Sequence, residues 1–158
     1  MYQFYLKQFD TLLVFQVDGF TQLVANQVQS LLLFLNYDCK MIMHESESSI
    51  KIILNQVYIA RIIEGCNALN VMILFVAFVV AFSGKWKSTL LFIVFGIVVI
   101  HILNVARIAF INIAQLYYPE YEHLLHDILF PLIIYGVVFG LWVIWVNKFS
   151  SYATKNGE

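Results

Sequence analysis

Residues 128–146, ILFPLIIYGVVFGLWVIWV, contain no charged side chain. A helix of about 20 apolar residues crosses the hydrocarbon core of a bilayer, where every backbone polar group must be hydrogen-bonded within the helix. Two further segments have the same character: residues 68–82, extended upstream by the polar-laced stretch IARIIEGCN (59–67), and residues 88–115. We therefore expect an all-α membrane protein, a polytopic helical bundle with three spanning helices.

The composition supports this class. The chain has 158 residues, of which 61% are hydrophobic and 12% charged, whereas a soluble domain is about half apolar and a quarter charged. Its mean hydropathy is +0.81. The net charge of −1 argues against nucleic-acid binding, which needs clustered cations. The two cysteines do not form a C-x-x-C pair, so we expect no metal and no cofactor.

The links between the predicted spans set the orientation. The link after the first span, SGKWKS, carries Lys85 and Lys87 and no acid, and the tail after the third span carries Lys148 and Lys155. The link at residues 115–127 carries only acids at its charged positions (Glu120, Glu122 and Asp127). Because positive links face the cytoplasm, the acidic link is expected on the extracytoplasmic side.

The first 60 residues are predicted to form an extracytoplasmic layer. An amphipathic helix is expected there, lying against the bundle or the interface with one apolar face (Phe20, Val24, Val28, Leu31 and Leu35). CKMIMH (39–44) and SIKIILN (49–55) flank the polar turn ESES, which predicts a β-hairpin. The expected single domain thus comprises this layer (1–60), a catalytic bundle (61–147) and a cytoplasmic tail (148–158).

The predicted orientation of the first span implies a further helix before it. A first span that enters from outside requires the N-terminus to be exported. Two alternatives stay open: a weak or re-entrant span within residues 4–35, or an additional helix upstream of the sequence.

Ionisable and nucleophilic groups beside the spans are candidate functional residues, because such groups are costly in a membrane. Cys66 lies at the predicted outer end of the first span, beside polar residues that recur every third position (Arg61, Glu64, Asn67 and Asn70). An accessible thiol near a base can act as a nucleophile. The alternative is an inert buried cysteine.

Two further candidates come from other segments. Arg107 lies near the outer end of the second span, one turn after Asn104; it either binds a carboxylate or substrate oxygen or snorkels to the headgroups. His126 precedes the third span and is followed by Asp127, with His123 as its competitor. We expect Cys66, Arg107 and His126 to meet at one pocket, a combination that suits covalent acyl transfer.

At these positions the chain resembles the exosortase/archaeosortase family, most closely its short type F branch. The resemblance covers residues 60–147 and rests on Glu64-Gly65-Cys66-Asn67-Ala68, on Asn104-Val-Ala-Arg107-Ile108, and on His126 before the last span. One departure is that the family commonly has Ser or Thr and then Gly after the cysteine.

The resemblance implies a membrane-embedded cysteine protease and transpeptidase of the bacterial inner membrane, with an extracytoplasmic active site and no cofactor. Its partners would be exported proteins with a C-terminal sorting signal (a short motif, an apolar helix and a basic tail) and the lipid bilayer. The catalytic residues would be Cys66, Arg107 and His126, with support from Glu64, Asn67, Asn104 and Asp127.

Two other functions compete with this one. In the first, the chain is a non-enzymatic membrane subunit whose polar stripes bind transmembrane helices of partner proteins. In the second, the chain is a small transporter, whose charged side chains would be distributed across the membrane-embedded core. The sequence favours it least because the charges gather near one face.

Overall fold

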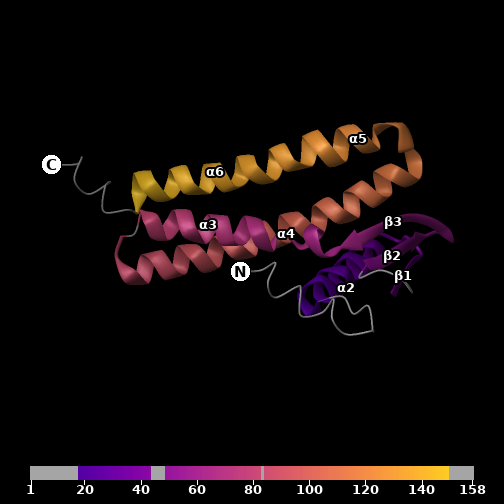
Figure 1. Cartoon of the computed structure of the whole chain (residues 1–158), viewed down its shortest axis with the longest axis horizontal. Coiled ribbons are helices and arrows are strands. Elements are labelled where there is room, and N and C mark those ends of the chain that lie inside the picture. The colour runs from indigo at the N-terminus through magenta and orange to yellow at the C-terminus, as the bar shows by residue number, and fades with distance from the viewer. Residues whose placement is uncertain (1–17, 44–48, 83, 150–158) are drawn as a thin grey trace. The chain divides into compact units, whose positions relative to one another are not determined.

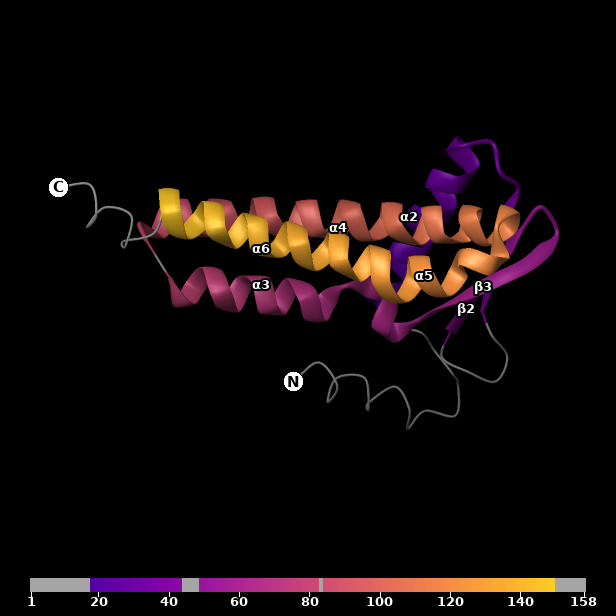
Figure 2. The same cartoon turned by 90° about the horizontal axis from the view of Figure 1, so that it is seen from above.

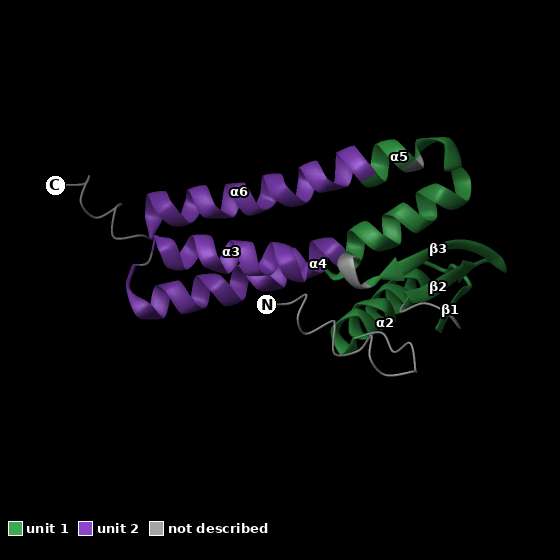
Figure 3. Ribbon diagram, in the orientation of Figure 1, with its two compact units in different colours: residues 1–67, 105–126 green, residues 68–104, 127–158 purple. Residues whose placement is uncertain are grey.

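The computed structural model describes residues 18–43, 49–82 and 84–149 (Figure 1). The predicted ESES turn, residues 1–17 of the predicted N-terminal layer and most of the predicted tail lie outside these ranges. The chain is mainly helical and divides into two compact units (Figure 3). The first unit consists of Met1–Asn67 and Val105–His126, and the second of Ala68–Asn104 and Asp127–Glu158.

The second unit contains helix α3 (Leu69–Ala81), the first part of α4 (Trp86–Tyr117) and helix α6 (Phe130–Lys148). These helices lie side by side in both views (Figures 1 and 2). The connection from α4 to α6 passes through a 3₁₀ turn, η2 (Pro119–Tyr121), a single turn, α5 (Glu122–Leu124), and a π-helical turn, η3 (Leu125–Leu129).

Aromatic packing holds this helical unit together. Trp145 of α6 is fully buried, its Nε1 donates to the carbonyl oxygen of Phe82 at 2.9 Å, and its ring centroid lies 4.9 Å from that of Phe92 on α4. Gly96 of α4 has no side chain where the buried Phe75 ring of α3 approaches, and a Cβ atom there would overlap that ring. The three helices therefore pack through interlocking rings and one glycine.

Two of the described helices, Trp86–Tyr117 and Leu125–Lys148, are long and apolar enough to cross a membrane. Only 22% and 17% of their most apolar windows are buried, so most of their apolar surface is available to lipid. The predicted first span is shorter than expected. Helix α3 has 13 residues, about 20 Å at 1.5 Å per residue, against a hydrocarbon core of roughly 30 Å. The three-span prediction is therefore not confirmed.

The first unit contains helix α2 (Gly19–Phe34) and, in the described part of the chain, a three-stranded antiparallel sheet. The strands are β1 (Cys39–Met43), β2 (Ser49–Leu54) and β3 (Val57–Ile63), in the order β1-β2-β3. The sequence predicted two strands and assigned the region from residue 59 to a helical extension of the first span. That extension was wrong, because residues 59–63 belong to β3 and residues 64–67 form a 3₁₀ turn.

The physical reason lies in the turn that precedes β3. Asn55 and Gln56 have φ angles of 50° and 69°, and positive φ at both central residues is what a type I′ hairpin turn requires. The usual sequence signal for that turn is Asn-Gly, which is missing here. The strand itself, VYIARII, is rich in aromatic and β-branched residues that suit a pleated sheet.

Helix α2 was predicted to lie against the bundle or the interface; it packs on the sheet, through a set of side chains that differs slightly from the predicted apolar face. Its buried residues are Thr21, Val24, Ala25, Val28 and Leu32, whereas Leu35 is exposed. Val24, Val28 and Leu32 join Ile50, Ile52 and Leu54 of β2 and Ile108 and Ala109 of α4 in one core.

Candidate functional site

Cys66 lies on a short 3₁₀ turn, η1 (Glu64–Asn67), that directly follows β3. The predicted helical stripe through Arg61, Glu64, Asn67 and Asn70 is therefore wrong, since those residues belong to a strand, a 3₁₀ turn and the start of α3. The turn places the Cys66 side chain in a half-buried position. On this turn, the Cys66 thiol is not packed among the apolar side chains of a spanning helix.

Buried hydrogen bonds hold this turn against α2. Asp18 caps α2, and its Oδ1 accepts from the backbone nitrogens of Phe20 and Thr21, each at 3.0 Å. The Thr21 hydroxyl donates to Asp18 Oδ2 at 2.6 Å, and Asn67 Nδ2 donates to Thr21 Oγ1 at 3.1 Å. Asp18 and Thr21 have no exposed surface, and Asn67 is 1% exposed. The hydrogen bond from Asn67 to α2 therefore holds the turn in place and so positions the neighbouring residue, Cys66.

The next residue, Ala68, has a φ of 58°, in the left-handed region. This conformation costs an L-residue about 1–2 kcal/mol and is free of that cost for glycine. The family pattern commonly has Gly at this position. The backbone thus explains the pattern, and the chain retains the glycine-type conformation with an alanine.

This strain leads to a stability prediction. Ala68→Gly should raise the free energy of unfolding by about 0.5–1 kcal/mol, because the relief of strain exceeds the extra freedom of glycine in the unfolded chain. Denaturant titration in detergent micelles measures this change in the free energy of unfolding. Ala77→Gly, the same change inside α3, should instead lower stability by about 1 kcal/mol. Equal destabilisation by both changes would contradict the strain at Ala68.

The first unit encloses a cavity of about 260 Å³ that Cys66, Arg107 and His126 all line. Its apolar wall comes from β2, β3 and α4 (Ile52, Ile59, Ile62, Ile108 and Ile111), and its further polar lining from Arg61, Asn112 and Gln115. The structure therefore brings the three predicted catalytic side chains to one place from η1, α4 and η3. Both His123 and His126 are exposed, but among the described histidines it is His126 that lines this cavity, and its competitor His123 does not.

Two polar atoms at this cavity lack a hydrogen-bond partner within the described residues. One is Nε of the half-buried Arg107, and the other is Oδ1 of Asn112. Asn112 is 2% exposed, and its Nδ2 donates to the Ile108 carbonyl oxygen at 2.7 Å, which leaves Oδ1 as the unused acceptor. Buried polar groups are nearly always paired, so these atoms are available to a bound molecule with complementary groups.

The other predicted supporting residues lie elsewhere. Asn104 is fully buried on α4, and Asp127 is exposed; both belong to the second unit. The backbone of Glu64 is part of η1, and its side chain lies outside the described set. In the residues that the structure describes, no group of three or more His, Cys, Asp or Glu side chains could hold a metal ion.

The sequence pattern alone indicates no role for Asp18, Thr21 or Asn112. Asp18 could have been found, because an aspartate at the start of an amphipathic pattern is a helix N-cap signal. Asn112 falls on the same sector of α4 as other polar residues, but its unused acceptor depends on the bond to Ile108 and on the opposing sheet. Only the tertiary structure shows this hydrogen bond and the position of the sheet.

The two cysteines differ in accessibility. Cys39, at the start of β1, is 2% exposed, and burial together with the nearby Asp38 carboxylate raises its pKa. A raised thiol pKa lowers the fraction of reactive thiolate at neutral pH. Within the described residues, neither cysteine forms a disulfide.

This difference predicts selective alkylation. In the detergent-solubilised protein at neutral pH, iodoacetamide should label Cys66 faster than Cys39, because Cys39 is buried whereas Cys66 is half-buried, and the raised pKa of Cys39 leaves it less thiolate than an ordinary cysteine has. Mass spectrometry of the two cysteine-containing peptides gives the rates. Cys39→Ala should keep the fast labelling and Cys66→Ala should lose it; faster labelling at Cys39 would contradict the geometry.

The comparison with protein families agrees with the motifs. The family model of the transmembrane exosortases matches residues 9–146, which is most of the chain. The chain belongs to the exosortase family and is a membrane protein. No curated protein and no solved structure matches it. Membership of the type F branch stays a prediction.

Proposed function

We propose that the chain is a cysteine protease and transpeptidase of exosortase type. The observation that carries this proposal is the shared cavity of Cys66, Arg107 and His126 in a member of that family. A nucleophile, a proton carrier and a fixed cation are the three groups that covalent acyl transfer uses. The proposed substrates are exported proteins that end in a short motif, an apolar helix and a basic tail.

In the first half-reaction, the Cys66 thiol gives its proton to His126, and the thiolate attacks the carbonyl carbon of the scissile peptide bond. A carbon–sulfur bond forms, and negative charge develops on the carbonyl oxygen. His126 then donates its proton to the amide nitrogen as the carbon–nitrogen bond breaks. The products are a thioester on Cys66 and a released amine on the C-terminal fragment.

Arg107 is the proposed partner of the developing negative charge. Its guanidinium stays protonated throughout and presents donors in a fixed plane. Nε is shielded from solvent and has no protein partner in the described chain, so a substrate oxygen would satisfy it. A preformed donor in a half-buried cavity stabilises an oxyanion more strongly than one exposed to water.

In the second half-reaction, water or an amine attacks the thioester. His126 accepts the proton of the attacking group, and Cys66 leaves as the thiolate. Attack by water gives hydrolysis, and attack by an amine gives transfer of the substrate to an acceptor. Transfer of this proton from His126 back to the Cys66 thiolate then restores the starting protonation state in both cases.

The proposed location is the extracytoplasmic face of the bacterial inner membrane. Lys85 and Lys87 precede or begin α4, and Lys148 ends α6, so these positive charges mark one end of each spanning helix. The connection between α4 and α6 carries acids and no Lys or Arg. The positive-inside rule then assigns the connection that contains His126 to the exterior.

The central test replaces the nucleophile. Cys66→Ser and Cys66→Ala should reduce processing to background, because neither side chain supplies a thiolate. The readout is the gel mobility of an exported reporter that carries such a tail, in membranes that contain equal amounts of each variant. Retained processing would exclude the thiol mechanism and favour the alternative, a membrane subunit that binds partner helices.

A matched histidine pair tests the proton carrier. His126→Gln should slow processing by about 10²–10⁴-fold, the usual effect of losing a general acid–base group. His123→Gln, three residues away and outside the cavity, should leave the rate within about twofold. The same time course of reporter processing measures both. A larger loss in the His123 variant would reverse the assignment.

A further inference from the structure

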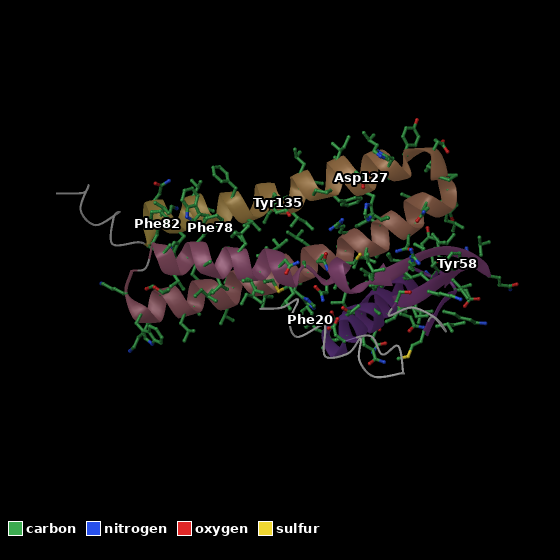
Figure 4. The ribbon with its side chains drawn as sticks, in the orientation of Figure 1. Phe20, Tyr58, Phe78, Phe82, Asp127 and Tyr135 are labelled. Atoms are coloured by element: carbon green, nitrogen blue, oxygen red, sulfur yellow. The ribbon has the colours of Figure 1, made fainter. Side chains whose placement is uncertain are left out.

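Strand β3 is an edge strand whose outer edge pairs with no strand in the described chain. It is apolar apart from Arg61, and Val57, Tyr58 and Ile63 are 51%, 54% and 47% exposed. Figure 4 labels Tyr58 on this strand. Exposed, apolar edge strands are normally shortened, charged or covered, because they pair with other chains. An edge that is left open in this way suits a partner that adds a strand.

The cavity follows this edge. Ala60, Arg61 and Ile62 are consecutive and all line it. Successive side chains of a strand point to opposite faces, so a cavity on one face alone would meet only alternate residues. The cavity therefore reaches the edge of β3.

The strand is also irregular at this point. Tyr58 pairs with Ile53 and Ala60 with Ile52, which leaves Ile59 as a bulge without a partner on β2. Ile59 lines the cavity as well. Bulges re-aim side chains and are frequent at sheet edges next to active sites.

The chain leads directly from this edge to the nucleophile. β3 ends at Ile63, and Cys66 follows on the next turn, η1. On the α4 side of the same cavity, the unused Oδ1 of Asn112 can accept a hydrogen bond from a main-chain N–H. A cavity of about 260 Å³ is smaller than most ligand pockets, which start near 300 Å³. It therefore has room for a few groups of a substrate, and the remainder must lie outside.

We propose that an extended segment of the substrate polypeptide pairs with the outer edge of β3 as a fourth strand and so brings its scissile carbonyl to Cys66. This proposal rests on the proposed function and names how the substrate is held. Main-chain hydrogen bonds to the edge supply affinity, and the cavity receives alternate side chains, as in other cases of strand addition. β3 has seven residues, about 23 Å at 3.3 Å per residue, so roughly seven extended substrate residues fit beside it.

Site-specific crosslinking tests this contact in the full-length protein. The photoreactive residue p-benzoylphenylalanine is placed at Tyr58, and at Ile42 as a matched control, in a Cys66→Ala background with the tailed reporter co-expressed. Ile42 is 51% exposed and lies on β1, the opposite edge strand. Irradiation should link the reporter to the Tyr58 position and not to Ile42. Equal capture at both positions, or capture at neither, would overturn the proposal.

A peptide series tests the strand geometry itself. Synthetic peptides that copy the reporter segment before its cleavage site compete with reporter processing, and one backbone amide at a time is N-methylated. Because strand hydrogen bonds involve every second residue on one edge, methylation should weaken competition about 3- to 10-fold at alternate positions and little between them. Loss without this alternation would show that the segment does not bind as a strand.

The two proposals fail in different ways. If Cys66→Ala still processes the reporter, the thiol mechanism is wrong, whatever the crosslinks show. If Cys66→Ala is inactive while Tyr58 captures no reporter, the enzyme assignment stands and strand addition alone is wrong.

Discussion

The buried hydrogen bonds from Asp18 through Thr21 to Asn67 are the interaction on which the site depends. They join the start of α2 to the turn after β3, two regions separated by the whole sheet in sequence. Each of the three side chains is almost completely buried, so loss of one partner would leave the next polar group unsatisfied at a cost of about 1–3 kcal/mol. This arrangement fixes the backbone beside Cys66 without using Cys66 itself. The position of the thiol is thus set by the fold of the first unit.

The bilayer imposes a second constraint, because its hydrocarbon region tolerates apolar surfaces but not unpaired backbone polar groups. The two units meet this constraint in different ways. The second unit is built of helices with apolar, largely unburied surfaces, which lipid can cover. The first unit contains a sheet whose outer edge pairs with no described strand, and open sheet edges are not tolerated in the hydrocarbon region. The sheet therefore requires contact with water, headgroups or another polypeptide. The proposed hydrolysis or transfer at Cys66 would also need a nucleophile from outside the lipid, so the same constraint suits the proposed chemistry.

The departure of this chain from the family pattern falls on positions with clear structural roles. Asn67 stands where the family commonly has Ser or Thr, and its amide donates to Thr21 in the buried network. Ala68 stands where the family commonly has Gly, and its backbone adopts the left-handed conformation that glycine favours. Both substitutions thus bear on the turn that holds the nucleophile. The proposed catalytic groups themselves, Cys66, Arg107 and His126, are those that the resemblance to the family implies.

The sequence by itself determined the membrane class, helices α2, α4 and α6, and the three candidate residues, because these depend on local periodicity, on segment length and on the chemistry of single side chains. The tertiary structure decided the rest. Strand β3 was read as a helical extension because its pairing with β2 is a contact between segments, introduced by a turn at Asn55 and Gln56 that lacks the usual glycine. The choice of His126 over His123 as a cavity residue, and the link from Asp18 to Asn67, also required segments that are distant in sequence to be close in space. A short stretch of sequence indicates which secondary structure that segment prefers, whereas burial and hydrogen bonding between segments depend on the folded chain.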